Sequence, residues 1–356
     1  MAAGGLRTPE GKTVFVRGVC LSPYHPREGW ELSPATRGLD QRLIVGLGAN
    51  CILPTQATTL AEVAAWKKLG VYTIPQILYS PAKVSTFANG YDCPVPVYVS
   101  EENRKGLRDA ARDQASALKG SSGILAMSLG SEYAWSAYSG DLGFTYGGFD
   151  DDTLAAYRSY LKGRFGTAEQ YNEMTGKSLS SLDEALPPVE WQRSPAFWEW
   201  WRFMREAFEG FLQQAQEGVR AIGWDCPTTY QFARGVRWDP ASEGSCLRFL
   251  DLLSGDVFRE QALSWPTYCA EIDRLVSSAG RRPVLVSQTG VHTLHVDPAE
   301  AARTLKQSIA CILLHPEVAG IGLYEYCDQW ARAGKPEVQE DTDAREFWGL
   351  VTAERT

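Results

Sequence analysis

The sequence predicts a (β/α)8 barrel, also called a TIM barrel, with a helical insertion after the fourth strand. Strand and helix patterns alternate along nearly the whole chain, which is typical of parallel βα units. Eight strand candidates can be counted, the number that closes such a barrel. The apolar residues of the intervening helices recur at spacings of three and four, as expected for outer helices that pack on a barrel.

The predicted strands are short apolar runs, each followed by turn or helix signals. They span Val14–Val19, Asn50–Leu53, Tyr72–Ile77, Ile124–Leu129, Thr228–Phe232, Leu250–Asp256, Val284–Ser287 and Gly320–Tyr326. Six helices are predicted between them, at Gly38–Leu47, Leu60–Leu69, Asn103–Leu118, Pro195–Ile222, Trp265–Ala279 and Pro298–Leu314. The stretch Ala134–Pro195 is far longer than one connection. We expect it to be an insertion with its own helix, Asp152–Arg164, over the active-site edge of a single catalytic domain, residues 1–356.

Composition is compatible with one large enzyme domain. The 356 residues are 44% hydrophobic, which provides for a sizeable core. The 35 basic and 43 acidic residues give a net charge of -8, which disfavours nucleic acid as a partner. The eight cysteines show no CxxC or Cys/His spacing, so we expect no disulfide framework, no metal site and no cofactor. Without a leader-like or membrane-spanning apolar stretch in the sequence, a cytoplasmic protein that does not bind a membrane is expected.

Two predicted strands deliver a polar side chain at the carboxyl end, the edge at which parallel barrels carry their active sites. The fourth strand runs on to Ser131 and Glu132, and the seventh runs on to Gln288. Tyr133 and Trp135 flank Glu132 with apolar surface, an environment that suits a general acid. We therefore expect Glu132 and position 288 to face one barrel mouth.

This pair of strand ends resembles clan A of the retaining glycoside hydrolases. In that clan the fourth strand carries the acid/base Glu, and the seventh ends in a Val-Ser/Thr-Glu-x-Gly pattern that contains the nucleophilic Glu. The segment Val286–Gly290 matches this pattern except that Gln288 is the amide of the expected residue. The insertion is similar to that of the family 42 β-galactosidases at Tyr157–Thr167, Tyr171–Gly176 and Pro187–Pro188. The resemblance implies a carbohydrate substrate, with a β-galactoside, a β-glucoside or a β-glucan favoured.

The resemblance also implies a mechanism. Glu132 is the acid/base, and position 288, as a glutamate, is the nucleophile, about 5 Å away in a retaining pair. An amide is a far poorer nucleophile and carries no charge, so this chain should bind substrate and barely turn it over. Two departures weaken the match to any one family. Ser131 stands where the clan usually has Asn, and no Arg follows the second strand in the segment Leu53–Gln56.

Several interpretations of Gln288 stay open. It is an engineered Glu→Gln replacement that inactivates a hydrolase, or it belongs to a natural pseudoenzyme that only binds glycan. Otherwise the enzyme is active through another carboxylate, for which Glu325 is the candidate, or Gln288 is a structural residue in a wrongly placed strand. Glu132 likewise has two interpretations, as the acid/base or as a buried ion-pair partner.

Further polar and aromatic residues follow the predicted strand ends and are candidates for substrate binding, although each could equally have a structural role. They are Tyr24, His25, Gln56, Ser131, Trp135, Tyr138, Gln231, Arg234, Asp256, Arg259, Glu325, Asp328 and Trp330. Aromatic rings on the insertion suit the faces of sugar rings. We expect Trp135 and at least one of Tyr138, Phe144 and Tyr146 to line the cleft.

Overall fold

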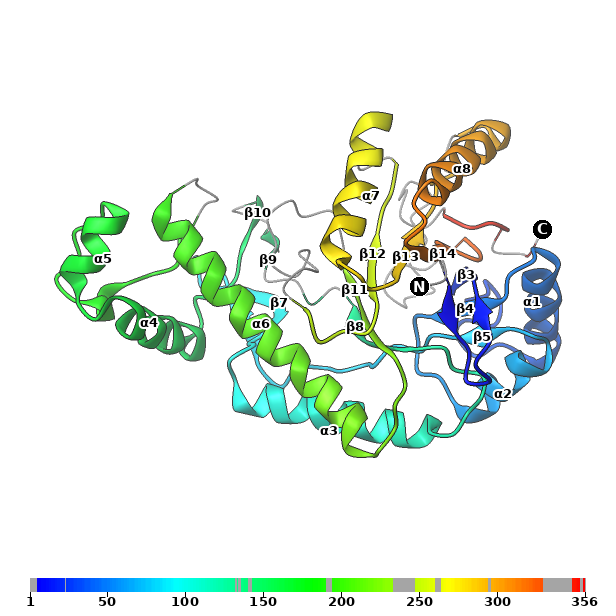
Figure 1. The fold of residues 1–356 in the computed structure, drawn as a ribbon, viewed down its shortest axis with the longest axis horizontal. Coiled ribbons are helices and arrows are strands. Elements are labelled where there is room, and N and C mark those ends of the chain that lie inside the picture. Colours follow the sequence, from blue (N-terminus) through cyan, green and yellow to red (C-terminus); the bar gives the residue numbers. More distant parts are fainter. Residues whose placement is uncertain are drawn as a thin grey trace.

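The computed structural model describes residues 5–22, 24–131, 133, 136–139, 143–189, 194–232, 247–259, 264–293, 296–328, 348–352 and 355, with only the backbone at 136–139 and 143–146. Its centre is a sheet of eight parallel strands in the order β5-β4-β3-β14-β13-β12-β11-β8 (Figure 1). The strands are β3 (Val16–Leu21), β4 (Cys51–Pro54), β5 (Tyr72–Thr73), β8 (Met127–Ser131), β11 (Thr228–Phe232), β12 (Leu253–Asp256), β13 (Val284–Thr289) and β14 (Val318–Leu323). Two parallel bridges, Thr73 with Ile124 and Gln76 with Ser128, join the two edge strands and close the barrel. The predicted fold class is therefore confirmed.

Seven of the eight predicted strands differ in their bounds from the observed ones, and two of them end earlier than expected. The third was expected at Tyr72–Ile77, but β5 ends at Thr73, because Pro75 has no N–H to donate to the ladder. Pairing resumes at Gln76 through the bridge to Ser128. The eighth was expected to reach Tyr326, but β14 ends at Leu323. Beyond it the backbone N–H of Glu325 donates to the carbonyl of Trp348 at 2.9 Å, so the chain pairs with the C-terminal segment instead.

All six predicted barrel helices are present. They are α1 (Pro34–Gly46), α2 (Leu60–Lys68), α3 (Glu101–Leu118), α6 (Pro195–Ala221), α7 (Trp265–Ala279) and α8 (Pro298–Leu313). A Ser, Thr or Asp side chain caps the amino terminus of each, and α2 has a full capping box between Thr59 and Glu62. Helices α3 and α6 pack so closely at Gly218 that no side chain fits there. An added Cβ would lie 2.3 Å from the carbonyl oxygen of Arg108.

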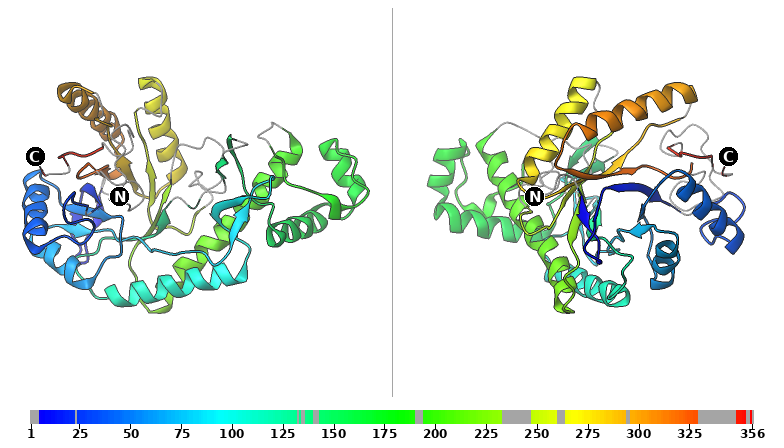
Figure 2. Two further views of the ribbon diagram at one scale, coloured as in Figure 1. Left: turned by 180° about the vertical axis from the view of Figure 1, so that it is seen from behind. Right: turned by 45° about the vertical axis from the view of Figure 1, so that its right-hand side comes forward.

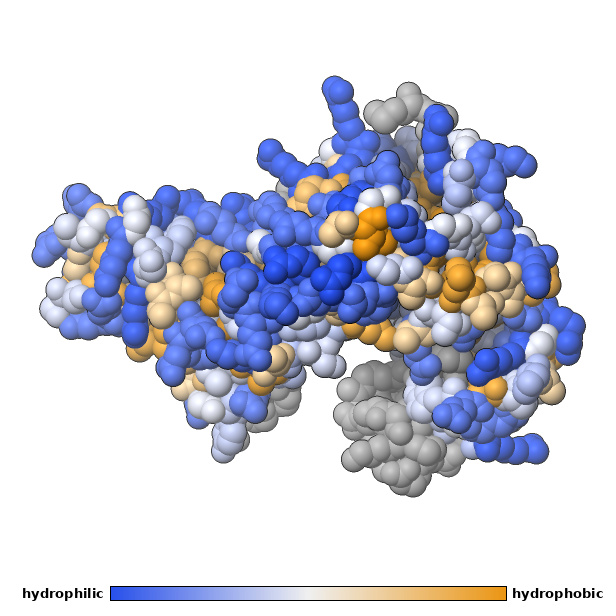
Figure 3. Space-filling view, turned by 90° about the horizontal axis from the view of Figure 1, so that it is seen from below, coloured by the Kyte–Doolittle hydropathy of each residue, from blue (hydrophilic) through white to orange (hydrophobic). Residues whose placement is uncertain are grey.

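The insertion contains α4 (Asp151–Phe165), α5 (Ala168–Thr175) and the short 3-10 helix η1 (Leu182–Glu184). In Figures 1 and 2 these helices form an arm that projects from the barrel beside the first half of α6. Tyr157 of α4 packs edge-on against Trp200 of α6, with ring centroids 4.9 Å apart, and both side chains are fully buried. The face of the molecule in Figure 3 is mostly hydrophilic, with apolar patches on the arm and on the barrel.

Three antiparallel hairpins were not predicted: β1 (Leu6–Arg7) with β2 (Thr13–Val14), β6 (Val84–Thr86) with β7 (Asp92–Pro96), and β9 (Ser136–Ser139) with β10 (Gly143–Tyr146). Leu6 of the first hairpin joins the apolar cluster inside the barrel, together with Val16, Leu125 and Leu285. The hairpin therefore contributes to the core beneath the site. Among the helices that the structure describes, none is long and apolar enough to cross a membrane.

Candidate functional site

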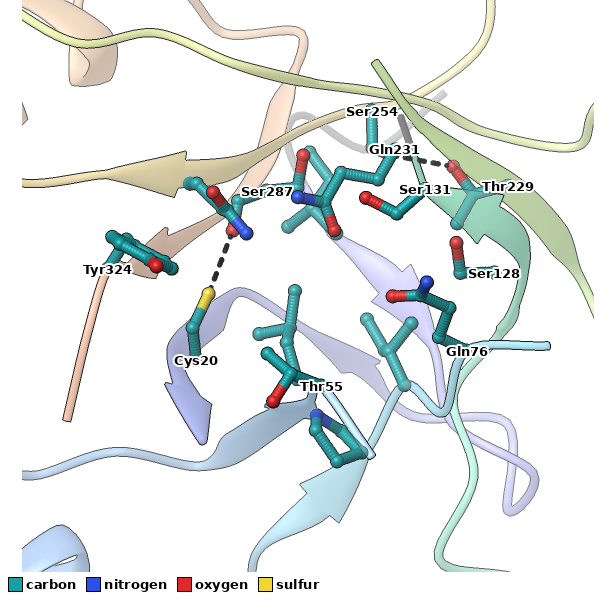
Figure 4. Close-up of a pocket in the computed structure, with 15 residues that line it drawn as sticks. Cys20, Thr55, Gln76, Ser128, Ser131, Thr229, Gln231, Ser254, Ser287 and Tyr324 are labelled. Atoms are coloured by element: carbon teal, nitrogen blue, oxygen red, sulfur yellow. Dashed lines mark hydrogen bonds between the residues drawn. The ribbon is translucent and has the colours of Figure 1, made fainter. Parts of the chain in front are cut away.

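A cavity of about 340 Å³ opens at the carboxyl ends of the barrel strands (Figure 4). Its lining consists of hydroxyl, amide and apolar groups, and the described lining residues include no Asp, Glu, Lys, Arg or His. The polar ones are Thr55, Gln76, Ser128, Ser131, Thr229, Gln231, Ser254, Ser287, Gln288 and Tyr324. Cys20 and the apolar residues Leu53, Pro54, Ile74 and Leu285 complete the wall. Such a lining suits an uncharged polar ligand.

A β-bulge near the end of β13 explains why Gln288 faces this cavity. Gly255 of β12 pairs with Val286, but the next residue, Asp256, pairs with Gln288, so Ser287 is an extra residue on β13. Leu285 points into the barrel, and regular alternation would turn Ser287 inward and Gln288 outward. With the bulge, both Ser287 and Gln288 line the cavity.

The end of β8 has a second bulge. Ser128 and Ser131 pair with Thr229 and Gln231 of β11, so three steps along β8 correspond to two along β11. Gly130 lies within this bulge at a φ of 148°, a conformation that residues with a side chain rarely adopt. Its carbonyl accepts a hydrogen bond from the Ser128 hydroxyl at 2.8 Å. As a result Ser128 and Ser131 both line the cavity, although they are an odd number of residues apart.

The chain just beyond Ser131 is fixed by aromatic residues of the barrel and its helices. The backbone N–H of Tyr133 donates to the Tyr230 hydroxyl, and its carbonyl accepts from the Tyr98 hydroxyl at 2.7 Å. The Tyr133 ring packs edge-on against Phe211 of α6, with centroids 5.8 Å apart. Glu132 lies outside the described residues, so its separation from Gln288 stays a prediction.

Asp256 lies behind the cavity wall beside Gln288. Its side chain is buried and accepts from the Ser287 hydroxyl at 2.9 Å and from the Gln231 amide nitrogen at 3.2 Å. Cys20 also contacts Ser287, because its thiol lies 3.5 Å from the Ser287 carbonyl oxygen. Burial raises the pKa of the Cys20 thiol, and the nearby carboxyl groups of Asp256 and Glu325 raise it further, so the thiol stays protonated and donates. Asp256 thus positions two cavity residues.

Comparison with known proteins gives fold relatives but no family. No protein-family model matches the sequence, and no curated protein sequence matches it. A β-galactosidase structure from Bacillus circulans sp. alkalophilus superposes with a TM-score of 0.73 at 12% identity, over 95% of this chain and 53% of that one. A β-galactosidase from the psychrophilic Marinomonas ef1 gives 0.68 at 14% identity, over 95% and 57%. An exo-β-agarase gives 0.64 at 13% identity, over 92% and 46%.

These structures are about twice as long as the chain, which spans roughly half of each. At such low identity the likeness concerns the fold. The chain therefore has a barrel fold that is also found in glycoside hydrolases.

The structure brings Ser131, Gln231 and Gln288 together in the cavity, but it places other predicted site residues elsewhere. Gln56 lines a separate cavity of about 340 Å³ between α1 and α2, with Trp30 and Trp66. The Arg259 guanidinium lies over the ring of Trp265, 5.0 Å from its centroid, near the start of α7.

Four more predicted residues are absent from the cavity wall. Tyr24 is buried against Trp30, with ring centroids 5.2 Å apart, and the ring nitrogen Nδ1 of His25 accepts from the backbone N–H of Arg27. Glu325 is fully buried, and the Asp328 carboxylate accepts from the backbone N–H of Gly349 at 2.7 Å. Trp135, Arg234 and Trp330 lie outside the described residues, as do the side chains of Tyr138, Phe144 and Tyr146.

Sequence reasoning missed much of the cavity wall. Five cavity residues lie inside predicted strands, where a barrel core normally has larger apolar residues; they are Gln76, Ser128, Thr229, Ser254 and Ser287. The signal that could have revealed the cavity is the presence of small polar residues within four neighbouring strands, β8 and β11 to β13. In the described part of the chain, no group of three or more His, Cys, Asp and Glu side chains is placed to hold a metal ion.

Proposed function

We propose that the chain binds a β-glycoside in the cavity at the carboxyl end of the barrel, and that position 288 is the nucleophile position of a retaining glycoside hydrolase mechanism. One observation carries the proposal: Ser131, which precedes Glu132, and Gln288 line the same cavity of a barrel whose fold neighbours include β-galactosidases and an agarase. We further propose that the insertion of residues 134–195 borders this site and that residues 1–356 act as one catalytic domain.

In the proposed mechanism the two positions have separate tasks. A carboxylate at 288 attacks the anomeric carbon and forms a glycosyl ester, while Glu132 protonates the departing oxygen. Water then hydrolyses the ester with Glu132 as the base. Gln288 keeps the shape of the nucleophile but supplies neither its charge nor its nucleophilicity, so the chain holds substrate without cleaving it.

The decisive experiment is Gln288→Glu, assayed on aryl β-galactosides and aryl β-glucosides. We expect hydrolysis to rise about 1,000-fold or more, because the change restores the attacking group. Gln76→Glu is the matched control, since it places the same carboxylate on another wall of the same cavity. We expect no gain from the control. Equal rates for both variants and the unchanged chain would show that position 288 is not the nucleophile.

A second candidate function is a pseudoenzyme that binds glycan without chemistry. The absence of any carboxylate from the described cavity lining favours it. Isothermal titration of the unchanged chain with intact methyl β-glycosides separates the two candidates when it is combined with the Gln288→Glu assay. Binding without a gain of activity in Gln288→Glu supports the pseudoenzyme, and binding together with a gain supports the hydrolase.

A further inference from the structure

We call one part of the cavity lining the floor, and it consists of Ser128, Thr229, Gln231, Ser254 and Ser287. The hydroxyl groups of the floor already donate their protons to other groups of the protein. The Ser128 hydroxyl donates to the carbonyl of Gly130 at 2.8 Å, and the Ser254 hydroxyl donates to the carbonyl of Tyr230 at 2.8 Å. A carbonyl oxygen can only accept, so the direction of both bonds is fixed. Thr229 must then donate to Ser254, whose oxygen is 3.1 Å away (Figure 4).

Asp256 also determines which hydrogen-bonding groups two further cavity residues can offer to a ligand. The Ser287 hydroxyl donates its single proton to the Asp256 carboxyl group, 2.9 Å away. Gln231 turns its amide nitrogen toward Asp256, which leaves the amide oxygen as the group for a ligand. The four hydroxyls and this amide therefore present oxygen lone pairs to whatever enters the floor.

We infer that the floor of this cavity recognises hydrogen-bond donors, and that Asp256 is the positioning residue that sets this preference through Gln231 and Ser287. The inference rests on the proposed function and narrows its ligand to a neutral sugar with free hydroxyl groups at the floor. A uronate, or a sugar in which an acceptor replaces a hydroxyl group, would place its own lone pairs against the lone pairs of the floor. No hydrogen bond can form between two acceptors, so such a ligand should bind more weakly. The other polar groups of the cavity lining differ from the floor, because the amides of Gln76 and Gln288 and the Ser131 hydroxyl can donate.

The ligand preference is tested on the unchanged chain, in which turnover does not interfere. Isothermal titration would compare methyl β-D-galactopyranoside and methyl β-D-glucopyranoside, their monodeoxyfluoro analogues and the corresponding uronates. For the parent that binds, we expect at least one fluoro analogue and the uronate to bind about tenfold more weakly, because each loses a donor at the floor. A uronate that binds as tightly as the neutral sugar, or fluoro analogues that all bind within twofold of it, would overturn the inference.

The role of Asp256 is tested by Asp256→Asn, whose amide can donate and so allows Gln231 to turn its own nitrogen toward the ligand. We expect the ratio of neutral-sugar to uronate affinity to fall about tenfold. Asp251→Asn is the matched control, because Asp251 accepts from the backbone N–H and hydroxyl of Thr228 at the other end of the barrel. That control should leave the ratio unchanged, and an unchanged ratio in Asp256→Asn would refute the assigned role.

A second variant keeps the inference testable if Asp256→Asn does not fold. Ser287→Ala removes one floor acceptor together with its bond to Asp256, and we expect several-fold weaker binding of the neutral sugar with little change for the uronate. A parallel loss for both ligands would contradict the inference. Failure of every probe to bind would overturn the proposed function and this inference together, whereas binding without discrimination would overturn the inference alone.

Discussion

At the scale of single residues, the amide of Gln288 is the feature on which the proposed chemistry depends. Its side chain is half-buried in the cavity, and among the described residues it has no hydrogen-bond partner of its own. A glutamate fits the same space, since the two side chains differ only in one terminal atom. The site is therefore shaped for a residue of this size, whether or not it carries charge.

Glu132 gives a separate residue-level prediction in the Gln288→Glu background. There, Glu132→Gln should slow substrates with poor leaving groups by at least about 100-fold, because those depend on protonation of the departing oxygen. Activated aryl glycosides should lose much less in the first step. A series of aryl glycosides with graded leaving-group pKa measures the effect, and an equal loss across the series would remove Glu132 from the acid/base role.

At the scale of elements, the two bulges place the site. The sequence predicted polar residues at the right strand ends, so Ser131, Gln231 and Gln288 were identified. It did not predict which of two neighbouring residues faces inward, because alternation breaks where a bulge inserts a residue. The same rule predicts Gln56 and Arg259 at the site, but the structure places them beside outer helices. The cavity floor went unrecognised because small polar residues inside strands resemble ordinary core positions.

The bulge in β8 can be tested through Gly130→Ala. At this positive φ an added Cβ is strained, and it would lie 2.4 Å from the Tyr133 ring. We expect the free energy of unfolding to fall by about 2 kcal/mol or more, measured by urea denaturation. Gly163→Ala on the exposed face of α4 is the control, because its Cβ would meet nothing within 4 Å. The control should be stabilising by roughly 0.5–1 kcal/mol, and similar effects of the two changes would contradict strain at Gly130.

At the scale of the whole molecule, the contacts made by the segments near the two chain ends were the least predictable parts. Eight strands and six helices follow from local pattern, but the hairpin that carries Leu6 and the pairing of Glu325 with Trp348 depend on contacts between distant segments. Arg355, near the C-terminus, makes another such contact. Its guanidinium pairs with the buried carboxylate of Asp40 on α1 at 2.9 Å, next to the Tyr326 hydroxyl.

This closing contact gives a whole-molecule prediction. Arg355→Ala should lower the free energy of unfolding by about 3–5 kcal/mol, because it leaves the Asp40 carboxylate buried without its ion-pair partner. Lys83→Ala is the control, since Lys83 pairs with Asp152 at 2.8 Å on an exposed surface. It should change stability by less than about 1 kcal/mol. Denaturant midpoints measure both changes, and a loss no larger than that of the control would show that the C-terminal contact does not stabilise the barrel.

The bulge that turns Gln288 into the cavity also bears on how readily this barrel changes over generations. Glutamine and glutamate codons differ by a single base, and the backbone already presents position 288 to the ligand. Neither repacking nor a shift of register has to accompany the exchange. Under the proposed function, a lineage with this scaffold can therefore move between holding a sugar and cleaving it by one point mutation, in either direction, while its fold stays under the same selection.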